Sequence, residues 1–452
     1  MKSYFLRRFL LIPPTLLGIT FLVFAITRFV PGGPMDRMLQ QAAGNGEGGG
    51  GKKASNEASG GLSEDQLEEL EEQFGLDKSM PVAYGQWLGV LPREVRLSKA
   101  EFGARGDDAI GGGETDPDNT ANLVLRGDGT LVRVIRKGDE ILSAKSRSNG
   151  GGIGSGIEEA GWKLRYEGEK VRKERFRKRN VAGAKVPAYA ARVVAYKTRF
   201  DGLLQGNLGR STVYNDSVWT MILERVPVAL YFGLLTTIIT YAVCLPLGVL
   251  KALKHRTFID SASSILIFIG YSIPGFALGA ILLVHFGARM SWFPLFGFTS
   301  PDFGEMAPWD QVKDLAHHTV LPLLCYLVGS FAMLTMLTKN NLMEQLSADY
   351  VRTAVSKGVG FRKAVFGHAF RNSMIPIATS AGSFVEIFIS GSILVETVFD
   401  IQGFGLLQYQ AVIARDVPVI MGTLTIAAFL MLLGNVISDV IVAMVDPRIK
   451  FK

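Results

Sequence analysis

Six long apolar segments are the feature of this sequence that most limits what it can fold into. They lie at about residues 9–30, 228–252, 264–286, 319–338, 374–395 and 418–445. Each is long enough to cross the roughly 30 Å of hydrocarbon in a bilayer as a helix. A helix also satisfies its own backbone hydrogen bonds there, where no water is present. The pattern therefore predicts an all-α polytopic membrane protein with six transmembrane helices.

The basic residues between these segments predict the orientation. Lys and Arg are frequent at 1–8, 253–263, 339–373 and 446–452, and they are sparse at 287–318 and 396–417. Short loops rich in Lys and Arg stay on the cytoplasmic side. Six spans with both termini in the cytoplasm satisfy this rule. We assign the net charge of +7 to topology in the same way, and we expect no nucleic-acid partner.

This orientation divides the chain into three parts. Residues 1–30 are the N-terminal transmembrane helix, 31–217 form a periplasmic region, and 218–452 form the main transmembrane domain. Within the periplasmic region, the alternating apolar residues of 122–136, interrupted by Gly127-Asp128-Gly129, indicate a β-hairpin, and 162–166 indicate a further strand. We expect a small β-containing insertion at about 93–198.

The Gly-rich stretch GEGGGGKK at 46–53 resembles a phosphate-binding loop, G-x-x-x-x-G-K-[ST]. Such a loop follows a strand and opens a helix, so that backbone N–H groups face the phosphates. No strand precedes this stretch, and Lys53 occupies the position of the Mg²⁺-binding hydroxyl. We interpret 46–53 as a linker. With no Cys–His or Ser–His arrangement either, the sequence predicts neither an enzyme nor a bound cofactor.

Several polar or helix-breaking residues fall inside the apolar segments. Glu386 lies near the middle of the fifth, where a carboxylate is costly and should face a cavity or a partner. Contact with a transported substrate and a packing role between helices both remain open for it. Pro274 and Gly275 should kink the third segment and line the pathway. We predict no metal site: His317 and His318 are adjacent in sequence, and no carboxylate is expected beside them.

Four further polar residues are predicted to pack between helices. Asn435 and Asp439 lie one turn apart in the last segment, and hydrogen bonds to a neighbouring helix are the expected role for both. Cys244 and Cys325 both lie in apolar segments. We expect them to be small packing residues rather than a disulfide.

The predicted cytoplasmic segment 347–373 (hereafter the 347–373 loop) has a more regular sequence pattern than a loop that only connects two spans requires. It is typical of two helical stretches, 347–357 and 361–372, broken near Gly358 and Gly360. The first should present Tyr350, Val351, Ala354 and Val355 on one side. A short helix of this kind can dock into a groove on a soluble partner.

The motif RTAVSKG at 352–358 resembles the EAA loop of permeases of the dipeptide/oligopeptide/nickel family of ABC importers. Arg352 stands where the broader motif has glutamate, so no role for that glutamate carries over. The resemblance places Tyr350, Arg352, Ala354, Lys357 and Gly358 in the coupling to an ATPase. Other stretches agree: RFVPGGP at 28–34, GNLGRS at 206–211, VETVF at 395–399, GFG at 403–405, RDVP at 415–418 and DPRI at 446–449. YSIPG at 271–275 and LTMLTKN at 334–340 resemble the Yej-type branch of these permeases.

The resemblance implies the type I ABC importer permease fold in a bacterial inner membrane. It further implies a second permease subunit, ATP-binding subunits on which ATP is hydrolysed, a periplasmic solute-binding protein, and a peptide substrate such as those of the Yej type, which include microcin C. Residues 93–198 have no counterpart in the family pattern. An ion-gradient-driven secondary transporter is the alternative, which Glu386 alone favours, and a membrane-anchored sensor fits six spans poorly.

Overall fold

The computed structural model describes residues 2–29, 75, 78–102, 120–124, 131–146, 163–179, 189–380 and 393–445. The chain forms two compact units. One comprises residues 1–77 and 208–452, and the other comprises residues 78–207. The first unit contains the apolar helices, and we refer to it as the helical unit. The linker predicted at 46–53 lies outside the described residues.

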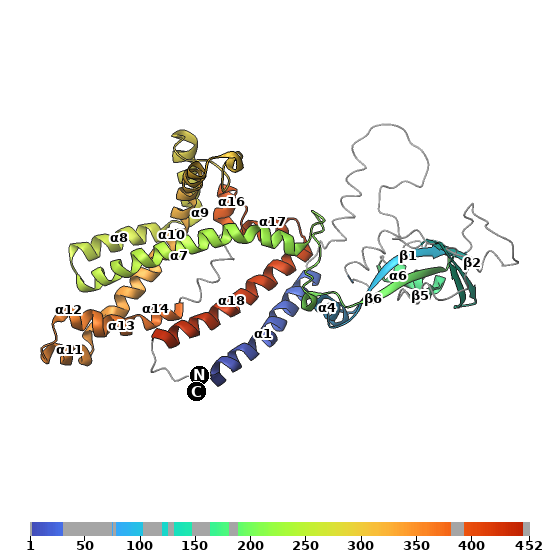
Figure 1. The fold of residues 1–452 in the computed structure, drawn as a ribbon, viewed down its shortest axis with the longest axis horizontal. Helices are drawn as coiled ribbons and strands as arrows, with labels where there is room; N and C mark the ends of the chain where they lie inside the picture. Colours follow the sequence, from blue (N-terminus) through green and yellow to red (C-terminus); the bar gives the residue numbers. More distant parts are fainter. Residues whose placement is uncertain are drawn as a thin grey trace. The chain divides into compact units, whose positions relative to one another are not determined.

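Long helices dominate the helical unit (Figure 1). Its helices are α1 (Lys2–Phe29), α7 (Val218–Leu253), α8 (Phe258–Ser272), α9 (Gly275–Leu282), the π-helical η3 (Leu283–Arg289), the short η4 (Phe303–Glu305), α10 (Pro308–Ser347), α11 (Asp349–Ser356), α12 (Phe361–Ala364), the π-helical η5 (Val365–Ala369), α13 (Phe370–Ser373), α14 (Ile375–Ser380), α16 (Ile393–Phe399), α17 (Phe404–Ile413) and α18 (Val417–Val445).

Four described helices are long and apolar enough to cross a membrane, and the bent pair α8–α9/η3 makes a fifth span if it is counted as one. They correspond to the first, second, third, fourth and sixth predicted segments. The described parts of the fifth, 374–395, are its two ends, because residues 381–392 lie outside the described part of the chain. The predicted break at Pro274 is confirmed: the two halves of the third segment meet at 89°.

Small residues let α7 and α10 pack closely along their length. A Cβ at Gly248 of α7 would lie 2.6 Å from the Cβ of Thr338 on α10. Cys244 is also buried against α10, and neither it nor Cys325 is in a disulfide. Because lipid is as apolar as a leucine side chain, helices in a membrane associate through close packing of this kind.

An ion pair joins the first and last helices. Arg8 Nε of α1 lies 2.9 Å from Asp439 Oδ2 of α18. The predicted helix-to-helix role of Asp439 is thereby confirmed. The contact places the beginning of α1 beside the end of α18 in the antiparallel arrangement seen in Figure 1.

The second unit holds the predicted β-containing insertion. Its elements are α4 (Met80–Leu88), β1 (Arg93–Glu101), β2 (Thr120–Val124), β3 (Leu131–Lys137), β4 (Glu140–Ser146), β5 (Lys163–Glu167), α6 (Glu169–Arg179), β6 (Arg192–Arg199) and the short η2 (Leu203–Gln205). The strands form two antiparallel three-stranded sheets, in the orders β1-β6-β5 and β2-β3-β4. The predicted hairpin is confirmed by the pairing of β2 with β3, in which Thr120 lies opposite Ile135 and Val124 opposite Leu131.

The insertion has a small core of its own. Leu123, Val134, Val193 and Ala195 are fully or almost fully buried in one apolar cluster. A buried ion pair lies beside this core, with Arg192 Nη2 2.8 Å from Glu167 Oε2. Such a pair is tolerated away from water only when its geometry is good. The insertion therefore folds around specific interactions, although the sequence suggested only β content for it.

Candidate functional site

The 347–373 loop folds into two helices separated by a glycine turn, as predicted. Helix α11 covers Asp349–Ser356, and the second helical stretch runs from Phe361 through η5 to Ser373. Gly358 ends the first stretch with φ of +86°. Its N–H donates to the Val355 carbonyl at 2.9 Å, and the N–H of Val359 donates to the Ala354 carbonyl at 3.1 Å. A left-handed glycine in this place is a common helix terminator.

The apolar residues of α11 are spaced to lie along one side of the helix, as predicted, but they are not equally buried. Val351 is buried, at 3% exposure, whereas Tyr350 and Val355 are 39% and 41% exposed. Ala354 is intermediate. The sequence alone could not show that the neighbouring helices bury only Val351 among these side chains. Tyr350 instead lies against Gln345, to which its hydroxyl donates at 2.7 Å.

Val351 fastens α11 to the long helices. It belongs to a buried apolar cluster that draws residues from α7, α10 and both helical stretches of the loop: Val249, Ala252, Leu342, Val351, Ala364 and Ala369. Side chains packed at interior density transmit displacement rather than absorb it. A force applied to α11 therefore reaches the ends of α7 and α10.

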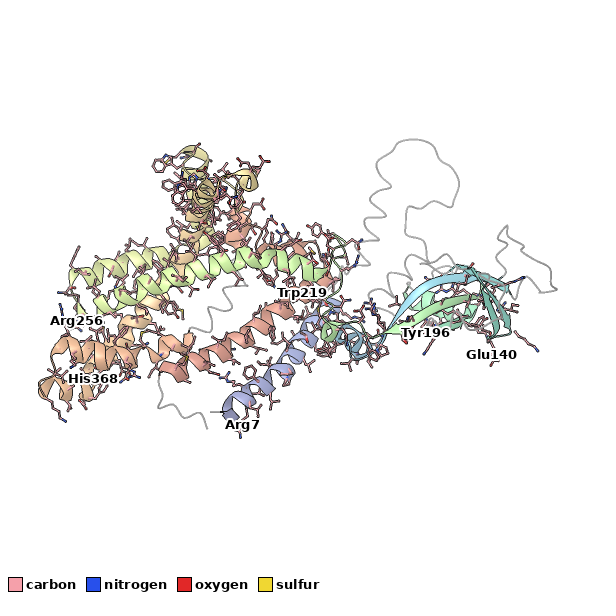
Figure 2. All side chains as sticks on the ribbon, in the orientation of Figure 1. Arg7, Glu140, Tyr196, Trp219, Arg256 and His368 are labelled. Carbon is pink, nitrogen blue, oxygen red and sulfur yellow. The ribbon has the colours of Figure 1, made fainter. Side chains whose placement is uncertain are left out.

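The outward side of the loop combines apolar and cationic residues. Phe361 and Phe366 are 60% and 54% exposed. Arg352, Lys357 and Gly358, three of the residues predicted for coupling, are exposed as well. Figure 2 shows His368 on the same stretch, at the end of the unit that also carries Arg256. Exposed aromatic side chains beside cations are typical of a surface that a partner protein covers.

The break at Pro274 brings the backbone of α9 close to α10. Pro274 is the residue that precedes α9, and a Cβ on Gly275 would lie 2.9 Å from the Cys325 carbonyl oxygen. A Cβ on Gly279, one turn later, would lie 3.0 Å from the ring of Phe399. The glycines thus permit the close crossing that follows the bend. Glu386, the other residue predicted for the pathway, lies outside the described residues.

Sequence reasoning missed a buried carboxylate that joins two of the quoted motifs. Glu396, in VETVF, is 2% exposed and accepts a hydrogen bond from the N–H of Leu406 at 2.7 Å. It thereby caps the start of α17, where a negative charge is favourable. Gly403 and Gly405, in GFG, leave room for it: a Cβ on Gly403 would lie 2.6 Å from the Glu396 carboxyl carbon. No local sequence signal marks this contact.

A second buried carboxylate joins GNLGRS to RDVP. Asp416 is 1% exposed. It accepts hydrogen bonds from Ser211 Oγ at 2.5 Å and from the N–H of Thr212 at 3.1 Å. Gly209, whose φ is +90°, brings the loop back so that its carbonyl accepts from the N–H of Val218 at 3.1 Å. The turn before α7 is therefore fixed to the turn before α18.

This contact predicts the effect of removing the carboxylate. Asp416→Ala should destabilise the turn by about 1–3 kcal/mol, because Ser211 and Thr212 lose a buried acceptor. Trypsin should then cleave after the exposed Arg210 roughly tenfold faster in detergent, since 1.4 kcal/mol is a factor of ten in an opening equilibrium. Asp302→Ala, at an exposed position, is the control. Equal cleavage rates in the two variants would contradict the prediction.

The expectation that no carboxylate lies near His317 and His318 was wrong. Both histidines lie within α10, which begins at Pro308, well before the predicted span. Asp314 is one turn before His318 on that helix, and its Oδ1 lies 3.4 Å from His318 Nδ1. The same carboxylate accepts hydrogen bonds from Ser300. Within the described part of the chain, no three or more His, Cys, Asp or Glu residues gather into a candidate metal site.

Comparison with known proteins identifies the family. Residues 244–451 match the model of the binding-protein-dependent transport system inner membrane component. The chain is 30% identical over 455 residues to the peptidoglycan transport system permease protein YejB of Agrobacterium fabrum, with 100% of this chain and 99% of that protein covered. The chain belongs to the family of binding-protein-dependent transport system inner membrane components.

Two further relatives match shorter parts of the chain. The inner membrane ABC transporter permease protein YejB of Escherichia coli O157:H7 is 40% identical over 249 residues, which cover 54% of this chain and 68% of that protein. The oligopeptide transport system permease protein AppB of Bacillus subtilis is 35% identical over 259 residues, which cover 57% and 80%. The alignment with the Agrobacterium protein covers the whole chain, so the insertion at 93–198 has an aligned counterpart there.

Membership in this family settles the general role of the chain. It is a multi-pass inner-membrane permease subunit of an ABC importer and not an enzyme. ATP is hydrolysed on separate ATP-binding subunits, and a solute-binding protein delivers the cargo. The comparisons lend no support to the ion-gradient-driven alternative.

Proposed function

We propose that this chain forms one half of a heterodimeric channel that carries peptides across the inner membrane, and that the 347–373 loop is its contact with the ATPases. The arrangement of α11 carries this proposal. The helix is fixed in a buried core through Val351, while Tyr350 and Val355, which flank Val351 around the helix, are left exposed. A helix that is held in a core and still presents apolar side chains outward is suited to receive movement from a partner.

The five residues predicted for coupling have distinct parts in this proposal. Tyr350 supplies apolar contact area, and Arg352 and Lys357 supply exposed positive charge at the rim. Ala354 keeps the helix narrow where it approaches the partner. Gly358 shapes the turn through its left-handed backbone. Charges at a rim steer association, while aromatic residues at the centre supply most of the affinity.

We propose further that both termini and the 347–373 loop lie in the cytoplasm. The Arg8–Asp439 pair puts the beginning of α1 and the end of α18 at one end of the unit. Ser438 Oγ donates to the Thr379 carbonyl at 2.5 Å, so α14, which directly follows the loop, lies at the same end. The basic residues of 1–8 and of the loop then share one side, as the positive-inside rule requires.

The bend at Pro274 and the carboxylate of Glu386 are our candidates for the translocation pathway. Broken helices at membrane depth are tolerated where they line a cavity or are covered by protein. The exposed apolar residues of α8, among them Leu266 and Tyr271, would face either lipid or the second permease subunit. The insertion would lie on the periplasmic side, where the solute-binding protein docks.

The names of the relatives support peptides as the substrate class. One belongs to an oligopeptide transport system, and the relative that matches the whole chain belongs to a peptidoglycan transport system. Peptides released from peptidoglycan are therefore the substrates we would test first, with microcin C as a second probe.

Co-purification followed by uptake tests the proposal. A tagged chain would be extracted mildly from its native membrane, and its partners would be identified by mass spectrometry. Recovery of an ATPase and a second permease is the expected result. Membranes with and without the chain would then be compared for ATP-driven uptake of labelled peptides from digested peptidoglycan. If the ATPases are recovered but uptake does not depend on this chain, the proposed substrate class is refuted. If the ATPases are absent from an intact preparation, the coupling assignment is refuted.

A further inference from the structure

Helix α8 is attached to its unit in an unusual way. Its apolar residues are exposed, among them Ile265 at 61%, Leu266 at 72% and Ile269 at 58%. The one buried residue of this helix is a carboxylate, Asp260, at 5% exposure. Exposed apolar side chains of a membrane helix can face lipid, so they do not fix the helix to its neighbours. Here a buried charge holds the beginning of α8.

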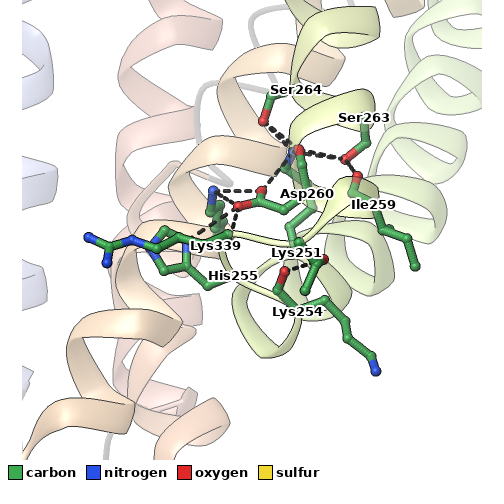
Figure 3. Close-up of polar contacts among 10 residues, drawn as sticks. Lys251, Lys254, His255, Ile259, Asp260, Ser263, Ser264 and Lys339 are labelled. Atoms are coloured by element: carbon green, nitrogen blue, oxygen red, sulfur yellow. Dashed lines mark hydrogen bonds and ion pairs between the residues drawn. The ribbon is translucent and has the colours of Figure 1, made fainter.

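Two buried lysines from two other helices neutralise Asp260 (Figure 3). Lys339 of α10 donates to Oδ1 at 2.6 Å and to Oδ2 at 2.8 Å. Lys251 of α7 lies 3.2 Å from Oδ1 and has no exposed side-chain surface. Charges removed from water need partners of opposite sign at short range. The carboxylate is therefore the point at which α7, α8 and α10 meet.

The remaining donors and acceptors complete this arrangement. Lys251 Nζ also donates to the Asp260 carbonyl at 2.9 Å and to the hydroxyls of Ser263 and Ser264 at 2.9 and 2.7 Å. The N–H of Arg256 donates to Asp260 Oδ2 at 3.2 Å, and His255 Nδ1 lies 3.3 Å from the same oxygen. Lys251 is thus satisfied largely by α8 itself. The bond between Lys339 and Asp260 is the charged contact between the beginning of α8 and α10, while the other end of α8 packs with Gly270 near Val328 of α10.

The charged residues continue directly into the core that fastens the 347–373 loop. Lys251 lies between Val249 and Ala252 on α7, and Lys339 lies one turn before Leu342 on α10. Val249, Ala252 and Leu342 belong to the same buried cluster as Val351 of α11. The ends of α7 and α10 therefore contact α11 through apolar side chains and α8 through charged ones.

We propose that the Lys339–Asp260 bond is a positioning contact that makes α8 move together with α11, so that displacement of the 347–373 loop reaches the bend at Pro274. This inference rests on the proposed function, in which the loop receives the movement of the ATPases. Lys339, Asp260 and Lys251 touch neither ATP nor substrate in this account. They determine whether the α8 half of the broken span follows the loop.

The test measures a distance that does not depend on knowing the substrate. Spin labels would be placed at Leu266 on α8 and at Ser356 on α11, both exposed, with Cys244 and Cys325 replaced by alanine. Lys339→Met cuts the bond to α10 and leaves Asp260 paired with Lys251. Lys339→Arg restores a charged donor. Lys313→Met, which removes an exposed ion pair with Asp310 on α10, is the matched control.

In the complex with its ATPases, the wild type, the Lys339→Arg variant and the control should each give one narrow distance distribution, unchanged between nucleotide-free and ATP–vanadate-trapped states. Lys339→Met should broaden the distribution and shift it on trapping. It should also lower the uptake of peptidoglycan peptides per ATP hydrolysed by roughly three- to thirtyfold, the range found for residues that couple distant sites. A purely structural role would reduce the amount of complex and leave this ratio unchanged.

An unaltered, narrow distribution and an unaltered ratio in assembled Lys339→Met would overturn the proposal. Asp260→Asn provides the second variant, and it should show the same broadening in whatever fraction assembles. Failure of the proposed function would look different, because the wild type itself would then show no ATP-driven uptake. The distribution in the nucleotide-free permease would still report whether Lys339 holds α8 in place.

Discussion

Gly358→Val should uncouple the permease from its ATPases while leaving the transmembrane helices folded. The residue has φ of +86°, and a Cβ added there would meet no atom within 4 Å. The free-energy cost of the substitution therefore comes from the backbone conformation alone, since a β-branched residue rarely adopts positive φ. Forcing it to do so costs about 1–3 kcal/mol. The turn would relax to another shape, and the orientation of α11 relative to the second helical stretch would change.

The experiment compares Gly358→Val with Gly358→Asn. Asparagine adopts the left-handed conformation far more readily than other residues with a Cβ. We expect the valine variant to lose roughly five- to hundredfold in co-purified ATPase and in ATP-driven uptake, because each 1.4 kcal/mol is a factor of ten. The asparagine variant should stay within about threefold of the wild type. Similar losses in both variants would show that lack of a side chain, rather than backbone conformation, is what the site requires.

The features that were predictable from the sequence are those encoded locally. The apolar segments are long and continuous, so the positions of the five spans found among the described residues could be read directly. Pro274 lacks an N–H group, and the break in the third segment followed from that. Gly358 ends a short helical pattern, and its left-handed backbone is what such a position commonly requires. Each of these rests on residues within a few positions of one another.

The buried charges could not be found in the same way. Asp260 lies 79 positions from Lys339, and Asp416 lies 205 positions from Ser211. A carboxylate at the end of an apolar segment looks like an ordinary solvated residue until its partner is known. The same limitation applies to α11, because which of Tyr350, Val351 and Val355 is buried depends on where α7 and α10 end. Long-range packing decided these positions.

The insertion combines a feature that could be predicted from the sequence with one that could not. Alternating residues in 122–136 were enough to predict a hairpin, which β2 and β3 form. They were not enough to predict that β6, from the far end of the insertion, would lie between β1 and β5. Strand order in a sheet depends on contacts between residues distant in the chain, which a single sequence does not reveal.

Gly403→Ala should be among the most destabilising substitutions of a small residue in the helical unit. The added methyl group would lie 2.6 Å from the carboxyl carbon of Glu396 and 2.6 Å from Oε2. Glu396 is buried, so it has no free space into which to turn. Its movement would also break the hydrogen bond to the N–H of Leu406 at the start of α17. We expect a loss of about 2–4 kcal/mol from overpacking together with an unsatisfied buried group.

A double-mutant cycle isolates this contact. In a Glu396→Ala background the methyl group added by Gly403→Ala finds space, so the additional cost of that substitution should fall below about 1 kcal/mol. Gly329→Ala is the matched control, because a Cβ added to this glycine of α10 would meet no atom within 4 Å and alanine favours a helix. The measurement is the fraction of chain that stays monodisperse after graded heating in detergent. Equal penalties for Gly403→Ala in both backgrounds would mean that Glu396 is not the group that the added methyl displaces.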